Sequence, residues 1–125
     1  MSRPTGAVRP KDALGRMGEE VAARHLESDG FVVLERNWRC DDGELDIVAR
    51  DGRTLVVCEV KTRSSNRYGS PFEAITERKL HRLERLGMRW MRERGVRPDR
   101  MRVDIVSVLA PARGQRVIEH VRGLS

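Results

Sequence analysis

The apolar residues near the N-terminus recur at three- and four-residue steps, which is the period of a helix with one buried face. The apolar positions of this pattern are Leu14, Met17, Val21, Ala22 and Leu26. Asp12 is suited to cap such a helix, and Asp29-Gly30 is suited to end it. Residues 1–11 carry two prolines and basic side chains without an apolar period. We therefore predict a disordered tail over residues 1–11 and a helix after it.

Three segments rich in strand-forming residues follow this helix. Phe31–Trp38 contains the run Phe-Val-Val-Leu, and Arg39–Gly43, with two aspartates and a glycine together, is typical of a turn. The next two segments, Glu44–Arg50 and Thr54–Arg63, are separated by Asp51-Gly52. This dipeptide favours a hairpin turn because both of its positions tolerate positive φ. The sequence therefore predicts three strands, the last two of them paired.

The second half of the chain predicts one more helix and two more strands. Apolar residues recur with helical spacing over Phe72–Arg94, and Gly95 and Pro98 are suited to end that helix. Met101–Leu109 and Arg116–Val121 are expected to be strands. The predicted order is αβββαββ, a mixed β-sheet flanked by helices in the α/β class, and residues 12–125 are expected to form one domain.

The composition narrows the classes of function. The chain has 125 residues and a net charge of +6, with 38% hydrophobic and 35% charged residues. A basic balance favours an anionic partner such as nucleic acid, although a general bias toward arginine would produce the same charge. No apolar run approaches the roughly 20 residues of a membrane span, and the N-terminus lacks a signal-peptide core. We expect a cytoplasmic protein without membrane contact, and two cysteines do not make a disulfide framework.

The predicted hairpin gathers charged residues on one face. If Asp51-Gly52 forms a two-residue turn, Glu44 lies opposite Glu59, and Asp46 is a diagonal neighbour of Glu59. Because side chains alternate along a strand, Lys61 shares the face of these three carboxylates. The run before Glu59 is apolar on both faces, which is typical of an inner strand. The charges therefore arrive together at one end of a covered strand.

Three carboxylates on one face repel one another and favour a compensating cation. Their hard oxygen atoms suit Mg²⁺ or Mn²⁺, which can polarise a phosphoryl oxygen and activate water. Lys61 could orient that water or stabilise the charge of a pentacovalent phosphorus. The alternative is structural: Glu59 and Lys61 would form a surface ion pair worth less than about 1 kcal/mol.

A set of residues in fixed order resembles a known family. The strand residues are Gly43–Ala49 and Glu59-Val60-Lys61, and the others are Gly18-Glu19, Asn37, Tyr68-Gly69, Pro71, Lys79 and Arg102-x-Asp104. The chain resembles the YraN-like family of small uncharacterised proteins from about Gly15 to its end. That family is related to the archaeal Holliday-junction resolvases and has the three-layer, restriction-endonuclease-like fold of the PD-(D/E)XK nucleases.

The resemblance implies roles for five residues. Asp46 and Glu59 would be metal ligands, and Lys61 would be the catalytic lysine. Glu19, on the first helix, would complete the metal site, and its position beside the buried stripe agrees with this. The alternative for Glu19 is a partly buried residue covering the sheet. Glu44 would support the ligands or bind an additional metal ion.

Basic residues elsewhere predict a surface for nucleic acid. Arg78, Arg82, Arg85 and Arg89 recur with helical spacing, with Lys79 beside them. Such a stripe suits a phosphate backbone, although glutamates between its members also fit a solvated face. Arg63 and Arg67 lie in the loop after Lys61 and are better placed to touch a substrate, and Tyr68 in that loop could stack on a base or simply pack. The histidines, His25, His81 and His120, are isolated in sequence and are interpreted as surface or core residues rather than ligands.

The leading hypothesis is a Mg²⁺- or Mn²⁺-dependent endonuclease that hydrolyses DNA, with a preference for branched DNA resting on the family resemblance alone. The second hypothesis is a nucleic-acid-binding module with a catalytically silent site in a repair or recombination complex. A third is a nuclease acting on RNA. A homodimer is expected by analogy, because resolvases make two symmetric cuts.

Overall fold

The computed structural model describes residues 10–65, 67, 69–70, 72 and 75–124. The elements are α1 (Pro10–Ser28), β1 (Val32–Cys40), β2 (Gly43–Asp51), β3 (Thr54–Arg63), α2 (Glu77–Arg94), β4 (Arg100–Leu109) and β5 (Val117–Val121). The predicted order αβββαββ is therefore confirmed. No helix in this part of the chain combines the length and apolar character needed to cross a membrane.

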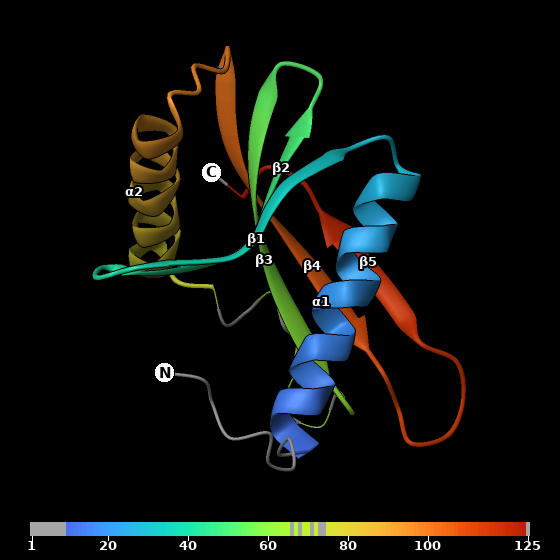
Figure 1. The fold of residues 1–125 in the computed structure, drawn as a ribbon. Helices are drawn as coiled ribbons and strands as arrows, with labels where there is room; N and C mark the ends of the chain where they lie inside the picture. The colour runs from blue at the N-terminus through green and yellow to red at the C-terminus, as the bar shows by residue number, and fades with distance from the viewer. Residues whose placement is uncertain (1–9, 66, 68, 71, 73–74, 125) are drawn as a thin grey trace, which may run out of the picture.

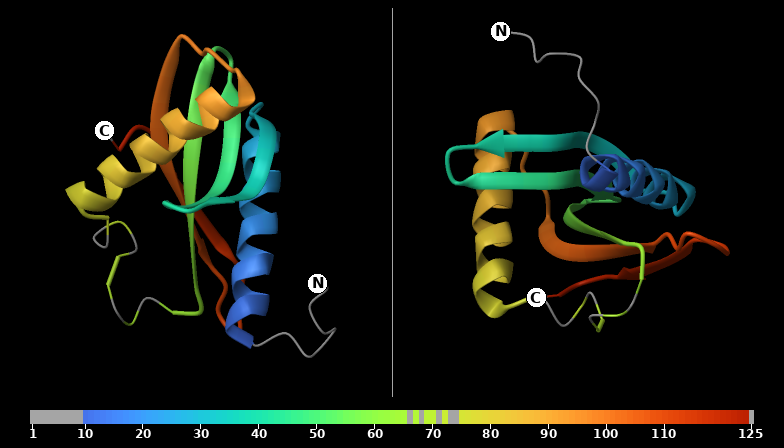
Figure 2. Two further views of the ribbon diagram at one scale, coloured as in Figure 1. Left: turned by 60° about the vertical axis from the view of Figure 1, so that its left-hand side comes forward. Right: turned by 90° about the horizontal axis from the view of Figure 1, so that it is seen from below.

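The five strands form one mixed sheet in the order β1-β2-β3-β4-β5. β3 and β4 are parallel, and the other neighbours are antiparallel. The parallel pair needs a crossover, and α2 provides it. α1 covers one face of the sheet and α2 covers the other (Figures 1 and 2). The predicted three-layer α/β architecture is confirmed.

The inner strand β3 supplies both halves of the core. Val56 and Cys58 pack on the side of α1, whereas Leu55 and Val57 pack on the side of α2. All four side chains are buried, as the continuous apolar run predicts for a strand covered on both faces. By the same alternation, Glu59 and Lys61 face the side of α2.

Gly18 sets the distance between α1 and β3. Any side chain at this position would overlap the side chain of Thr62. The helix backbone therefore approaches β3 closely, one residue away from Lys61.

Two helix boundaries differ from the prediction. α1 begins at Pro10, so Asp12 lies in its first turn rather than at its cap. Residues 1–9 of the predicted tail lie outside the described residues. α2 begins at Glu77, not Phe72, because Thr76 caps it: the Thr76 backbone is extended, and its hydroxyl accepts a hydrogen bond from the Lys79 amide at 3.1 Å.

The turn between β2 and β3 is also displaced. The last pair of the ladder is Asp51 with Thr54, so the two loop residues are Gly52 and Arg53. Only Gly52 has positive φ, at 61°, as in a type II′ turn. The predicted register is therefore wrong by two residues. A shift of two leaves each side chain of the paired segment, Ile47–Asp51, on its predicted face.

The tip of the β1–β2 hairpin bends toward α2 (Figure 2). β1 continues through Cys40, so only Asp41 and Asp42 form the turn that was predicted for Arg39–Gly43. Asn37 has a φ of 53°, and the β1–β2 ladder skips the position of Asp46. Beyond this point the strand turns over, since Leu45 packs with the core on the side of α2.

Candidate functional site

A cavity of about 570 Å³ lies between β2, β3, α2 and the hairpin tip. Its walls include six of the residues predicted to form the site: Glu44, Asp46, Glu59, Lys61, Lys79 and Arg82. The fold thus brings the charged end of β3 together with the first turns of α2.

Asp46 lies where β2 and β3 separate. The ladder between these strands ends at the pair Ile47 and Cys58, and one further step would place Asp46 opposite Glu59. Asp46 is therefore a direct rather than a diagonal neighbour of Glu59, which corrects the prediction. Its Oδ2 accepts a hydrogen bond from the Val60 amide at 2.8 Å. The Asp46 carboxylate thus occupies the place of a backbone acceptor in the ladder.

Burial is the main cause that raises the pKa of Asp46 to about 7, and the negative charge of Glu59 adds to it. The hydrogen bond from Val60 acts in the opposite direction. A divalent cation beside this carboxylate would favour its charged form. The pair of Asp46 and Glu59 therefore offers hard oxygen atoms in a place where a cation relieves repulsion.

Glu59 is buried and has two lysine partners. The Lys61 ammonium lies 3.7 Å from Glu59 Oε2, and the Lys79 ammonium bonds the same oxygen. Partial burial and the neighbouring Lys79 charge lower the pKa of Lys61, against the attraction of Glu59. Partial burial opposes the charged form of Lys79, but its hydrogen bond to Glu59 leaves its pKa raised. Lys79, predicted to contact nucleic acid, is therefore a member of the carboxylate cluster.

Glu19 and Glu44 are less closely associated with this pair. Glu19 is not in the cavity wall, although its charge is among the smaller causes that raise the pKa of Asp46. Glu44 is more than half exposed and forms an ion pair with Arg39 at 3.0 Å. Within the described ranges, three ligand-type atoms lie within 4.8 Å of one another in two other groups, not in the predicted acidic set. Asp46 and Glu59 are neighbours, Glu44 lies in the same cavity wall but pairs with Arg39, and Glu19 lies outside that wall.

The predicted nucleic-acid residues divide into two groups. Arg63 donates a hydrogen bond to the Gly69 carbonyl at 2.8 Å and so holds the loop after β3. Arg67 is exposed, and Tyr68 lies outside the described residues. Arg82 lines the cavity and donates to the Asp42 carbonyl at 2.9 Å. Arg82 is therefore a basic group in the cavity wall, whereas Arg63 and Arg67 are not part of that wall. Arg63 and Arg82 each also have a structural partner.

Part of the arginine stripe on α2 holds the hairpin tip. Arg89 forms ion pairs with Asp41 and Asp42, at 2.6 and 2.9 Å. These contacts agree with the bend of the tip toward α2. The stripe is therefore both a basic surface and an attachment for one wall of the cavity.

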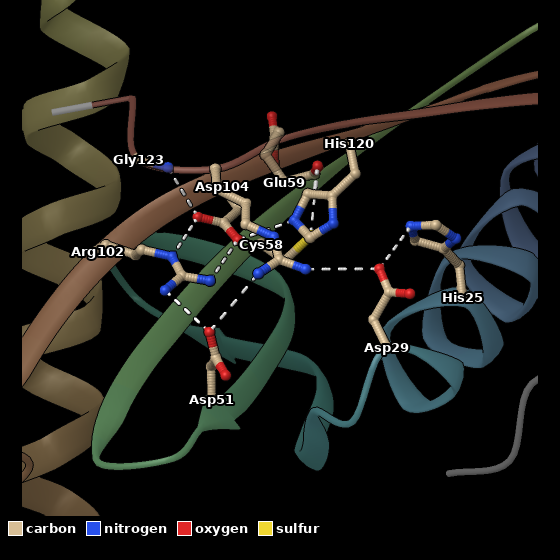
Figure 3. A network of polar contacts seen from close by, with 10 residues as sticks. His25, Asp29, Asp51, Cys58, Glu59, Arg102, Asp104, His120 and Gly123 are labelled. Atoms are coloured by element: carbon tan, nitrogen blue, oxygen red, sulfur yellow. Dashed lines mark hydrogen bonds and ion pairs between the residues drawn. The ribbon is translucent and has the colours of Figure 1, made fainter.

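A second charged cluster lies on the other face of the sheet, around Asp104 (Figure 3). Asp104 is fully buried, and its two oxygens accept from Arg102 Nε at 2.9 Å, Arg102 Nη2 at 3.2 Å and the Gly123 amide at 3.0 Å. His120 Nε2 lies 2.8 Å from Asp104 Oδ2. Arg102 and Asp104 are two residues apart on one strand, so the sequence alone indicates that they share a face. His120 and Gly123 are distant in sequence and reach Asp104 only in the folded chain.

The fold and the cavity define a small three-layer α/β protein with paired carboxylates and lysines at one end of its inner strand. Residues 18–108 match the uncharacterised protein family UPF0102. The chain belongs to this family, the YraN-like group of small uncharacterised proteins that its sequence resembles.

Relatives match along nearly the whole chain. A UPF0102 protein of Nocardioides sp. is 56% identical over 120 residues, which cover 96% of this chain and 97% of the relative. UPF0102 proteins of Frankia alni and Beutenbergia cavernae are each 55% identical over 117 residues, covering 94% of this chain and 98% and 99% of the relatives. The similarity therefore extends across the whole fold.

Proposed function

We propose that this protein is a Mg²⁺- or Mn²⁺-dependent endonuclease that hydrolyses DNA phosphodiester bonds in the cavity beside α2. The observation that carries the proposal is the pair of Asp46 and Glu59 carboxylates in the wall of an open cavity, with Lys61 on the same face of β3. The raised pKa of Asp46 supports it, since a bound cation would offset the repulsion between the two carboxylates.

Asp46 and Glu59 would hold the metal ion through their carboxylate oxygens. The ion would polarise the phosphoryl oxygen and lower the pKa of a bound water. Lys61 would orient the attacking water or stabilise the charge that develops on the phosphate. Arg82 and Arg67 would bind neighbouring phosphates of the backbone.

The preference for branched DNA and the homodimer belong to the same proposal and rest on the family resemblance. A dimer would place two sites for two symmetric cuts. A cytoplasmic location belongs to the same proposal.

One observation favours the alternative, a nucleic-acid-binding module without catalysis. Lys79 already bonds Glu59, so an ammonium group offsets the charge that a metal ion would otherwise offset. In this function the basic rim would bind DNA, and the carboxylates would hold the two lysines in place.

Cleavage assays separate the two functions. The full chain is incubated with linear duplex, single-stranded and four-way-junction DNA, with Mg²⁺, Mn²⁺ or EDTA. Glu59→Gln and Lys61→Ala are compared with Glu27→Gln, which removes an exposed carboxylate of α1. The nuclease predicts metal-dependent cutting that falls at least ~100-fold in the two cavity variants only, with DNA binding retained. Binding without cutting in every metal would instead support the module.

A further inference from the structure

Two histidines that are isolated in sequence come together in the fold. His25 lies in the last turn of α1, Asp29 directly follows that helix, and His120 lies on β5 (Figure 3). One ligand-type atom of each residue lies within 4.8 Å of the other two. The cluster packs on the side of α1, on the face of the sheet opposite to the cavity with Asp46 and Glu59.

The spacing within this cluster is close to that of a metal site. His25 Nε2 lies 3.4 Å from Asp29 Oδ2, and the rings of His25 and His120 have centroids 5.6 Å apart at an angle of 77°. In a tetrahedral zinc site with bonds of about 2.0–2.1 Å, neighbouring ligand atoms are about 3.3 Å apart. One edge of such a tetrahedron is therefore already formed.

His25 supplies an unsatisfied nitrogen. Its Nε2 is shielded from solvent and makes no hydrogen bond among the described residues, although Asp29 Oδ2 lies 3.4 Å away as an ion-pair contact. Buried polar atoms without a partner are uncommon in folded proteins, because desolvation is then uncompensated. An electron-pair acceptor at this point would satisfy the nitrogen.

His120 is already oriented. Its side chain is only 6% exposed, and its Nε2 is held by the Asp104 carboxylate, which Arg102 and Gly123 fix in turn. A carboxylate on one ring nitrogen fixes the tautomer of a metal-binding histidine and leaves the other nitrogen, here Nδ1, to bind the ion. Figure 3 shows the His120 ring between Asp104 and the two residues at the end of α1.

We propose that His25, Asp29 and His120 bind a zinc ion that joins the end of α1 to the edge strand β5. Two imidazoles and one carboxylate suit Zn²⁺ better than Mg²⁺ or Mn²⁺, which prefer oxygen ligands alone. The site is structural, and its metal differs in class from the metal proposed for the cavity.

Arg122 competes with zinc for Asp29. Its guanidinium group lies 3.6 Å from Asp29 Oδ2 and 5.0 Å from the centre of the Phe31 ring, and its side chain is half exposed. This contact offsets the charge of Asp29 without a metal ion. Removing the arginine should therefore raise the affinity for zinc.

Calorimetric titration of the full chain with Zn²⁺ tests the site, with Co²⁺ absorption as a signature of imidazole ligands. His25→Ala carries the test, because His25 Nε2 makes no hydrogen bond whose loss would unfold the protein, whereas His120→Ala would also disturb Asp104. His81→Ala is the matched control, since His81 is an exposed histidine of α2. The double variant Asp46→Asn/Glu59→Gln removes the cavity carboxylates, so that failure of the zinc site and failure of the nuclease are read separately.

We expect the wild-type chain to bind one zinc ion, His25→Ala to bind at least ~10-fold more weakly, and Arg122→Ala to bind more tightly. His81→Ala and the double variant should bind as the wild-type chain does. The proposal is overturned if the wild-type chain binds no Zn²⁺ at micromolar concentration, or if His25→Ala binds it equally well. Loss of zinc binding in the double variant instead would assign the ion to the cavity and would equally overturn the proposal.

Discussion

Two buried carboxylates on neighbouring strands have opposite surroundings. Asp104 on β4 is fully buried on the side of α1, and each of its oxygens is held by groups fixed on β4, β5 or the segment after it. Glu59 on β3 faces the cavity on the side of α2, where its neighbours are two lysines and a second carboxylate, Asp46.

Asp104 and Glu59 are both buried, and they differ in the groups that surround their carboxylates. The partners of Asp104 match its charge and direct their donors at it, so it stabilises the fold. The carboxylates of the cavity repel each other, and the two lysines and the Val60 amide offset their charge only in part, so they favour a further cation. A buried carboxylate is thus a candidate for chemistry where its surroundings leave its charge incompletely compensated.

The largest expected effect separates activity from stability at Glu59. Glu59→Gln should lower metal-dependent DNA cleavage by about 10²–10³-fold, because it removes one of two proposed metal ligands. Its free energy of unfolding, measured in urea, should change by less than about 1 kcal/mol, since the Gln amide oxygen still accepts from lysine. Unchanged cleavage in Glu59→Gln would remove Glu59 from the site.

Asp104→Asn should have the opposite outcome. We expect the free energy of unfolding to fall by about 3 kcal/mol, because Asn lacks the charge and one of the two acceptor oxygens that Arg102, His120 and Gly123 contact. Urea unfolding measures the loss, and Asp99→Asn, at an exposed aspartate, is the control. Cleavage per folded molecule should not change. Loss of cleavage in a folded Asp104→Asn protein would contradict the division between the two carboxylates.

Asp46→Asn should make the metal-free protein more stable above neutral pH. The pKa of Asp46 is raised from 3.8 to about 7 in the folded protein, so the folded state binds this proton more tightly than the unfolded state. The free energy of unfolding therefore falls as the pH rises from 3.8 to about 7, because Asp46 loses its proton in the unfolded state first. Above a pH of about 7 the charged Asp46 destabilises the folded protein to its full extent.

Asn keeps an acceptor for the Val60 amide without the charge. We expect Asp46→Asn to gain on the order of 2 kcal/mol at pH 8 and to lose this gain as pH falls toward 3.8. Urea unfolding in EDTA measures the free energy of unfolding of both proteins at pH 8 and pH 4. Added Mn²⁺ should stabilise only the wild-type chain. An equal effect of the substitution at pH 8 and pH 4 would contradict the assigned cause.

The smallest expected effect is at Lys79. If its ammonium competes with a metal ion for Glu59, Lys79→Ala should bind Mn²⁺ about tenfold more tightly, a difference of about 1.4 kcal/mol. Lys79→Arg keeps the charge and serves as the control in the same titration. Weaker Mn²⁺ binding in Lys79→Ala would show that Lys79 positions Glu59 for the metal.

Local sequence patterns predict the features that depend on strand alternation and on helix-capping residues. The shared face of Asp46, Glu59 and Lys61 follows from strand alternation, and an error of two residues in register leaves it unchanged. The start of α2 was misplaced because the apolar period extends before Thr76, whereas the cap decides where the helix begins. These are properties of neighbouring residues.

The missed features depend on tertiary contacts. The bond between Lys79 and Glu59 joins a helix to a strand, and His25 meets His120 only because α1 ends beside β5. No spacing in the sequence carries such contacts, because each pair is far apart along the chain. The role of Glu19 stays a prediction: its charge acts on Asp46, but its side chain is not part of the cavity wall.

The contact between Gly18 and Thr62 has an evolutionary consequence. Gly18 precedes Glu19 and Thr62 follows Lys61, so one steric contact sets the distance between the first helix and the strand that carries the proposed chemistry. A larger residue at either position would move α1 away from β3 unless the other position became smaller. Positions 18 and 62 are therefore expected to change together among relatives, and Gly18→Ala should be tolerated only with a smaller residue at position 62.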